Sequence, residues 1–193
     1  YMADNYGDYD DIIELYNPTD GNINLAGYYL SDDYDNLKKW VFPQNDSLFI
    51  LAPNEYLVMW ADDEIFQGIN HLPFSLNKNG EAVILTHPNG NEIIHQINFG
   101  YQRSNISFGI NDQSGEWEYY INPTIGYENE DGFDGILNPP SINPSGGYSS
   151  NPTIISLTDN NLNSDVYYNF DSQIPVEDNY LYDQEIIINN STV

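Results

Sequence analysis

The chain contains no cysteine and only four basic residues, and each shortage excludes a class of function. Without thiols there is no disulfide, no cysteine-ligated zinc or iron–sulfur site and no thiol nucleophile. Four Lys and Arg residues against 30 Asp and Glu residues leave a formal net charge of −26 over 193 residues. Nucleic acids and anionic membranes are bound by clustered basic side chains, so we expect neither as a partner. No run reaches the ~20 consecutive apolar residues of a membrane span, and we expect no membrane insertion.

The sequence also lacks a convincing 3.6-residue apolar period, the pattern of an amphipathic helix. It has instead short apolar runs separated by turns that contain Asn, Pro and Gly. Hydrophobic residues make up 40% of the chain and aromatic residues 15%, which is enough to build a core. This pattern predicts an all-β protein made of antiparallel sandwiches. The strands expected in the first 122 residues are 12–16, 27–30, 39–42, 56–61, 82–86, 93–97, 107–110 and 117–121.

A change in composition divides the chain. The segment after residue 121 is rich in proline and glycine and carries an acidic stretch, which is typical of a linker. The β pattern then returns in residues 153–157, 166–170 and 185–188. We therefore predict a first domain over residues 1–128, a linker over 129–147 and a small β domain over 148–193.

Six segments, in order along the first domain, resemble the lamin tail domain family. They are residues 10–18, 25–33, 39–43, 56–62, 76–85 and 122–126. One departure is Ile12, which stands where the family usually has tryptophan. The resemblance covers about residues 1–128 and implies an immunoglobulin-like β-sandwich.

The second domain resembles the small C-terminal β domain of chitobiase and β-hexosaminidase proteins, through residues 146–148, 166–172 and 182–188. It departs from that pattern at Gln173, where glycine is usual, and in having no proline before Glu185. Bacterial surface proteins often place these two modules ahead of a CotH-type kinase domain. This resemblance implies an accessory region of a larger secreted protein, located outside the cell or at the cell surface.

Acidic residues flank two of the expected strands. If strands 12–16 and 26–30 paired antiparallel, Asp10 would face Asp32 and Asp11 would face Ser31. Two like charges about 4 Å apart at an effective dielectric constant of about 20 repel by about 4 kcal/mol. Ca²⁺ would offset this repulsion, because it prefers several oxygen ligands. We therefore hypothesise a calcium site formed by Asp8, Asp10, Asp11, Asp32 and Asp33.

The alternative is that these side chains diverge into water and sodium screens them. We expect two other acidic groups, residues 62–64 and 128–134, to be solvated loops. No other cofactor is expected.

No residue pattern indicates catalysis. The three histidines accompany no serine-nucleophile motif, so we expect a protein that is not an enzyme. The leading interpretation is an extracellular module that contacts a protein or a cell surface and is tuned by calcium. The alternative is a carbohydrate-binding module that uses exposed tyrosines, with Tyr168 and Tyr182 as candidates. A hydrolase fragment with acidic loop residues is a third, weaker interpretation. Trp40, Trp60 and Trp117 are expected in the core.

Overall fold

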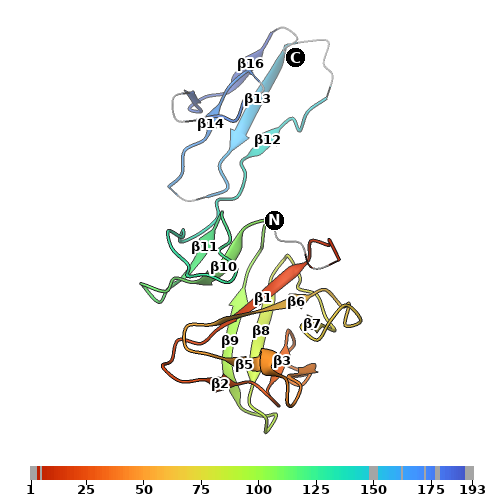
Figure 1. Cartoon of the computed structure of the whole chain (residues 1–193). Helices are drawn as coiled ribbons and strands as arrows, with labels where there is room; N and C mark the ends of the chain where they lie inside the picture. The colour runs from red at the N-terminus through yellow and green to blue at the C-terminus, as the bar shows by residue number, and fades with distance from the viewer. Residues whose placement is uncertain are drawn as a thin grey trace. The chain divides into compact units, whose positions relative to one another are not determined.

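The computed structural model describes residues 4, 6–147, 152–161, 163–171, 173–176 and 179–189. The chain divides into two compact units, Tyr1–Asp134 and Gly135–Val193, and each is considered by itself (Figure 1). Apart from one short 3-10 helix, the regular elements of the described residues are β-strands, which confirms the all-β prediction. In this part of the chain no helix has the length and apolar character needed to cross a membrane.

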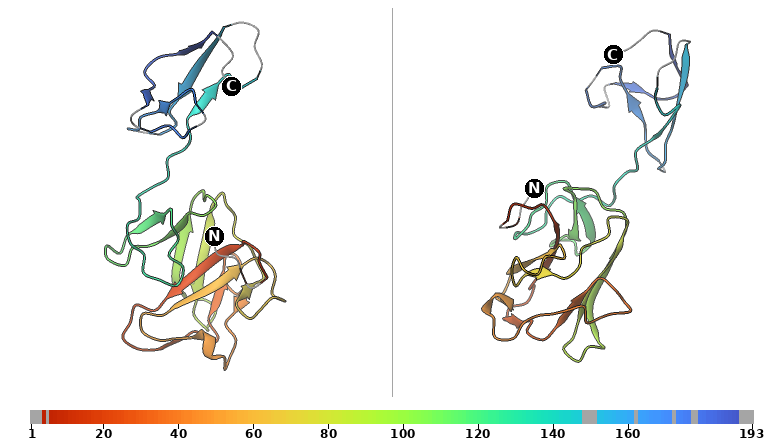
Figure 2. Two further views of the ribbon diagram at one scale, coloured as in Figure 1. Left: turned by 45° about the horizontal axis from the view of Figure 1, so that its top comes forward. Right: turned by 90° about the vertical axis from the view of Figure 1, so that its right-hand side faces the viewer.

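Unit 1 is an immunoglobulin-like sandwich with two main sheets. One sheet has the strand order β1–β6–β7, in which β7 runs parallel to β6, and the other has the order β4–β3–β8–β9. Figures 1 and 2 show β1 and β6 lying as one layer across the sheet that contains β8 and β9. These strands are β1 Asp11–Tyr16, β3 Tyr29–Ser31, β4 Trp40–Val41, β6 Tyr56–Ala61, β7 His71–Leu72, β8 Glu81–Thr86 and β9 Ile93–Phe99.

Two small sheets complete unit 1. The first pairs β2 (Ile23–Asn24) with β5 (Ile50–Leu51), directly after the 3-10 helix η1 (Ser47–Phe49). The second is a hairpin of β10 (Ser107–Ile110) and β11 (Trp117–Tyr120). The hairpin packs against β9 through its aromatic side chains, since the Trp117 ring stacks on His95 with 6.3 Å between ring centroids.

The predicted pairing of residues 12–16 with residues 26–30 is wrong. Strand β1 pairs antiparallel with β6, with Ile12 opposite Trp60, and β3 pairs with β4 and β8 in the other sheet. The physical reason is burial: the most hydrophobic run of the chain, β6, offers β1 a partner with an apolar face. The connection between β1 and β3 therefore crosses between layers instead of closing a hairpin.

The core of unit 1 is built from both sheets and from the connections between them. Its aromatic centre is Phe42, which is fully buried and meets Trp40 and Phe49 edge to face at centroid distances of 4.7 and 5.4 Å. Such edge-to-face pairs stabilise a core beyond the area they bury. Trp60 is also buried, as expected, whereas Trp40 and Trp117 are half-buried. Leu30, Met59, Leu72 and Ile84 are also fully buried.

One polar side chain, Asn17, is fully buried at the end of β1. Its Nδ2 lies 2.8 Å from the carbonyl oxygen of Gly21 and 3.0 Å from those of Leu51 and Ala52. Its Oδ1 accepts hydrogen bonds from the backbone N–H and the hydroxyl of Thr19. Asn17 therefore satisfies buried backbone groups of the crossing connection and of the segment after β5.

Unit 2 contains a three-stranded sheet, in which β13 (Thr153–Thr158) lies between β12 (Ser141–Asn143) and β16 (Ile186–Ile188). A two-stranded ladder of β14 (Tyr167–Tyr168) and β15 (Tyr180–Leu181) accompanies it. Strand β12 lies within the segment 129–147 whose composition predicted a linker. Phe133 also lies in that segment but belongs to unit 1, where it forms a backbone bridge with Tyr119.

Replacing Asn17 with alanine should lower the free energy of unfolding of unit 1 by about 2–3 kcal/mol, because three carbonyl groups, among them the buried one of Leu51, lose their donor. All three tryptophans lie in unit 1, so tryptophan fluorescence during urea unfolding reports on this unit. The exposed Asn22→Ala change is the control and should alter stability by less than about 0.5 kcal/mol. Equal stability of the two variants would contradict this role of Asn17.

Candidate functional site

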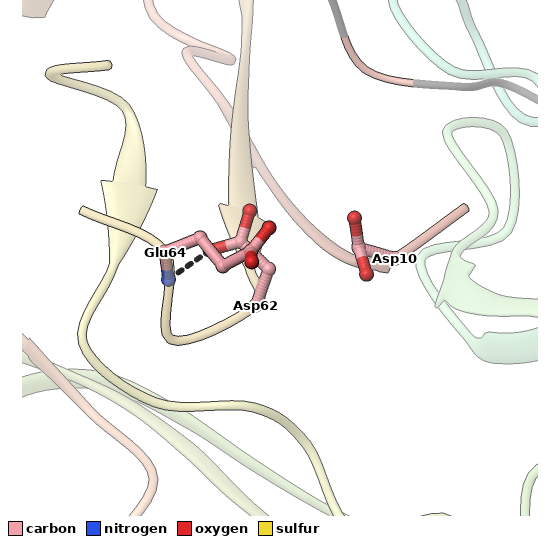
Figure 3. A group of neighbouring side chains, drawn as sticks. All are labelled: Asp10, Asp62 and Glu64. Carbon is pink, nitrogen blue, oxygen red and sulfur yellow. Dashed lines mark hydrogen bonds between the residues drawn. The ribbon is translucent and has the colours of Figure 1, made fainter. Parts of the chain in front are cut away.

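The pairing of β1 with β6 brings acidic residues together at one end of the ladder. Asp11 is opposite Ala61, so Asp10, which precedes β1, and Asp62, which follows β6, are neighbours. Glu64 turns back toward them from the next loop. One ligand oxygen from each of Asp10, Asp62 and Glu64 lies within 4.8 Å of the other two (Figure 3). These three residues are called the carboxylate cluster below.

Asp62 is the buried centre of the cluster, with a side chain that is 0% exposed. Its Oδ1 accepts the backbone N–H of Glu64 at 2.9 Å, the bond drawn in Figure 3. Its Oδ2 lies against Nδ1 of His71, which is also buried and stacks on Trp60. The expectation of a solvated loop at residues 62–64 is therefore wrong for Asp62, because β7 returns beside β6 and covers this carboxylate.

A folded turn places Asp4 beside the cluster. Asp4 Oδ1 accepts the backbone N–H groups of Tyr6, Gly7 and Asp8 at 2.9, 2.8 and 2.9 Å. The residue is only 8% exposed, and its Oδ2 is buried without a hydrogen-bond partner among the described residues. The same holds for Asp10 Oδ2 and for Oε1 of Gln67. Three oxygen atoms around the cluster thus lack the partner that buried polar groups almost always have.

The electrostatics of the cluster are unfavourable to ionised carboxylates. Burial raises the pKa of Asp10, and the charges of Asp62, Asp8 and Asp4 raise it further. Burial and the same acidic neighbours also raise the pKa of Glu64. Burial acts to raise the pKa of Asp4 too, but its three backbone N–H bonds outweigh burial and lower that pKa. The carboxylates at this end of the sandwich therefore repel one another when they are ionised.

A family model described as Lamin Tail Domain matches residues 1–101. The chain belongs to the lamin tail domain family. The matched region contains the whole carboxylate cluster and both main sheets of unit 1. Lamin tail domains are immunoglobulin-like, non-catalytic domains that often mediate protein contacts. No curated protein and no solved structure matches the chain.

Of the five acidic residues predicted from the sequence, Asp10 belongs to the carboxylate cluster of the lamin tail domain. Asp8 lies close by, since its charge raises the pKa of both Asp10 and Glu64, although it is exposed. Asp11 is exposed at the start of β1 and accepts the backbone N–H of Leu76.

Asp32 and Asp33 are not part of the cluster. Asp32 pairs with the ammonium group of Lys39, which compensates its charge, and Asp33 Oδ1 accepts the backbone N–H of Asp35 at 2.8 Å. Both line an open surface depression with Glu81. They lie beyond the end of β3, and the pairing that would have placed them opposite Asp10 and Asp11 does not form.

Sequence reasoning missed Asp4, Asp62 and Glu64 as members of one site. A signal was present, because an Asp-x-Glu pattern directly follows the most hydrophobic strand. This pattern identifies the site only if the strand before it, β6, is known to pair with β1.

A second group of acids in the lamin tail domain has a structural role. Glu14 accepts the backbone N–H of Gly126 at 2.6 Å. Asp112 accepts the Tyr56 hydroxyl at 3.2 Å and the backbone N–H of Asn129 at 2.9 Å. Burial and the Asp112 charge raise the pKa of Tyr56, so this phenol stays protonated and donates. These contacts fix the segment after β11 against β1 and β6.

In unit 2 the structure brings Tyr168 together with Phe170 and Tyr180. The ring centroid of Tyr168 lies 5.6 Å from that of Phe170 and 5.5 Å from that of Tyr180. Phe170 and Tyr180 are 52% and 60% exposed, whereas Tyr168, which was expected to be exposed, is half-buried because these two rings pack against it. The other predicted tyrosine, Tyr182, is half-buried, and its backbone N–H donates to the carbonyl of Val166 at 2.8 Å. Sequence reasoning did not identify Phe170 as part of this aromatic group.

Replacing Asp10 with asparagine should raise the melting temperature of the chelator-treated protein by a few degrees at neutral pH. A raised pKa means that the folded state disfavours the ionised Asp10, and the neutral amide removes that penalty. The advantage should disappear as the pH falls through the raised pKa, because the wild-type carboxylate is then protonated. Thermal unfolding across a pH series measures this, with the exposed Asp20→Asn as control. A lower melting temperature for Asp10→Asn at neutral pH would refute it.

Proposed function

We propose that the chain is a non-catalytic accessory module of a larger secreted bacterial protein, in which the lamin tail domain contacts a protein partner at the cell surface. The membership of a family that often mediates protein contacts supports the general role. The resemblance of residues 148–193 to the small β domain of chitobiase-type proteins supports the secreted setting and a CotH-type parent protein. The contact proposed here, its location and its calcium tuning go beyond what family membership provides.

The observation that carries the proposal is a set of exposed apolar side chains on the two loops around the carboxylate cluster. Phe66 is 76% exposed and Ile65 is 60% exposed, whereas the apolar core residues of the same domain are at most 6% exposed. On the other loop, Tyr6 and Tyr9 are 62% and 67% exposed. Large exposed apolar and aromatic side chains are typical of protein-binding sites.

The loop that carries Phe66 is held in shape from within. The backbone N–H of Gln67 donates to the carbonyl of Glu64 at 2.9 Å, and the side chains of these two residues are also hydrogen-bonded. His71, at the end of the loop, is fixed by Asp62. A preorganised loop loses little conformational entropy on binding, which favours a contact role for its tip.

The charge of the chain defines the chemistry of the partner. The chain has a net charge of −26, and the two segments that carry these apolar side chains contain Asp8, Asp10, Asp62, Asp63 and Glu64. A complementary partner presents an apolar pocket rimmed by Lys and Arg, because such a surface speeds association and excludes acidic competitors. The same surplus of acidic groups suits an extracellular setting where calcium is abundant.

A photo-crosslinkable phenylalanine derivative at position 66 should capture a bacterial surface protein in high yield from a cell-envelope extract. The control is the same derivative in place of Phe133, which is 50% exposed in the same unit. Phe66→Ser in an affinity pull-down should lose the same protein. Equal yields at both positions, or retention of the protein by Phe66→Ser, would contradict the proposed contact site.

A second candidate function, carbohydrate binding by unit 2, is favoured by the aromatic group of Tyr168, Phe170 and Tyr180. Exposed aromatic faces are suited to stacking on sugar rings, and an aromatic contact contributes about 0.5–1.5 kcal/mol beyond its buried area. Tyr168 and Tyr180 face each other across the β14–β15 ladder, which fixes their spacing.

A glycan array tests this candidate. Tyr168→Ala and Tyr180→Ala should each weaken binding of any recognised saccharide by up to about tenfold. Ile187→Ala serves as the control, because this side chain is 60% exposed in the same unit. Tyr182→Ala is included because the sequence alone favoured that residue. Absence of saccharide binding by the wild-type chain would rule out the carbohydrate function.

A further inference from the structure

We propose that the carboxylate cluster of the lamin tail domain is a calcium site, with Asp10, Asp62 and Glu64 as ligands and with Asp4 and Gln67 completing it. This set differs from the one expected from the sequence, because it depends on the β1–β6 pairing. The site stands on its own geometry and does not require the contact function.

The spacing of the three carboxylates fits a single bound ion. Calcium binds oxygen atoms at about 2.3–2.6 Å, so two ligand oxygens of one ion lie at most about 5 Å apart. One oxygen each from Asp10, Asp62 and Glu64 falls within 4.8 Å of the others. Figure 3 shows Asp10, which precedes β1, facing the carboxylates of Asp62 and Glu64.

The buried oxygens without partners are the independent observation that points to a ligand. Asp4 is more than nine-tenths buried, and its Oδ1 is used by three backbone N–H groups while its Oδ2 has no partner in the described part of the chain. Asp10 Oδ2 is also buried without a hydrogen-bond partner among the described residues. A buried anionic oxygen without a donor is costly, and a cation satisfies it directly.

Asp4 lies next to the cluster rather than elsewhere on the surface. Two hydrogen bonds tie it to the residues just before Asp10: its backbone N–H donates to the carbonyl of Asp8 at 3.0 Å, and its Oδ1 accepts the backbone N–H of Asp8 at 2.9 Å. Gln67 adds a neutral oxygen. Its side-chain Nε2 donates to Glu64, and its Oε1 is buried without a partner among the described residues. The arrangement thus offers four carboxylates and one amide oxygen.

Calcium fits this donor set better than other common ions. All five groups supply oxygen, whereas zinc prefers nitrogen and sulfur ligands. The imidazole of His71 does not change this, since its Nδ1 faces Asp62 and orients that carboxylate as an outer partner. Magnesium demands near-ideal octahedral geometry and retains several waters, whereas calcium accepts an irregular set of protein oxygens.

The position of the site has a structural consequence. An ion bound there would join residues 4 and 6–10 to the loop at residues 62–70, and these two segments carry the exposed apolar side chains. This consequence rests on the proposed contact function, whereas ion binding itself does not.

Isothermal titration of the chelator-treated full chain with calcium chloride tests the site. The measurement is made in physiological salt, where a Debye length of about 8 Å screens diffuse binding to the acidic surface. We expect one saturable site per chain and a higher melting temperature with calcium. Asp10→Asn should lose both, whereas the matched charge change Asp20→Asn, on an exposed residue outside the cluster, should keep both. Gln67→Leu should weaken binding without changing the charge.

Two results would overturn the proposal. One is the absence of saturable binding by the wild-type chain, and the other is equal binding by Asp10→Asn and Asp20→Asn, which would show only diffuse counterion attraction. Loss of fold does not confuse the test, because the melting temperature of each chelator-treated variant shows directly whether that variant is folded. Capture of a partner through position 66 in the presence of a chelator would separate the contact function from the calcium site.

Discussion

The antiparallel ladder between β1 and β6 is the constraint on which the rest of unit 1 depends. It buries Ile13 and Met59 in the core, and the same register sets Asp10 beside Asp62 at the solvent end. The side chains that stabilise the ladder and those that form the carboxylate cluster thus lie along one pair of strands. Because backbone hydrogen bonds fix the register residue by residue, a shift by one position would remove the apolar set from the core and would separate the cluster.

The surplus of acidic groups is arranged differently in different places. Asp32 is paired with Lys39, and Glu14 and Asp112 hold backbone N–H groups. At the end of β1 and β6, by contrast, Asp10 and Glu64 lie close to the buried Asp62, which contacts the buried His71. Proteins retain such unfavourable groups mainly where they serve a function, since burial of like charges lowers stability. That contrast within one domain is the reason for assigning a ligand to this end of the sandwich.

The lamin tail domain provides a rigid frame rather than a reactive centre. Its core is closed by aromatic rings and its crossing connection is held by the buried Asn17, whereas Tyr6, Ile65 and Phe66 are exposed on loops. Loops carried by a rigid sandwich are a common way to build binding sites, because the frame sets their ends and leaves their tips free to vary. Unit 2 repeats this logic on a smaller scale, with aromatic side chains around a short two-stranded ladder.

The sequence by itself determined the fold class and most strand positions. The period-2 pattern and turn residues located β6 at residues 56–61 and β10 at residues 107–110 with the bounds found in the structure, and the lamin tail resemblance led to the family. These features are local, since alternation and turn chemistry are encoded within a few residues.

Only the tertiary structure decided which strands pair, and therefore which acids meet. Asp10 and Asp62 lie far apart in the sequence. They become neighbours because β1 pairs with β6, the most hydrophobic strand. The buried Asp62–His71 contact and the unpaired Asp4 oxygen likewise depend on chain segments folding back over one another. A local pattern contains no information on such long-range burial, because the free energy that selects the partner comes from the whole core.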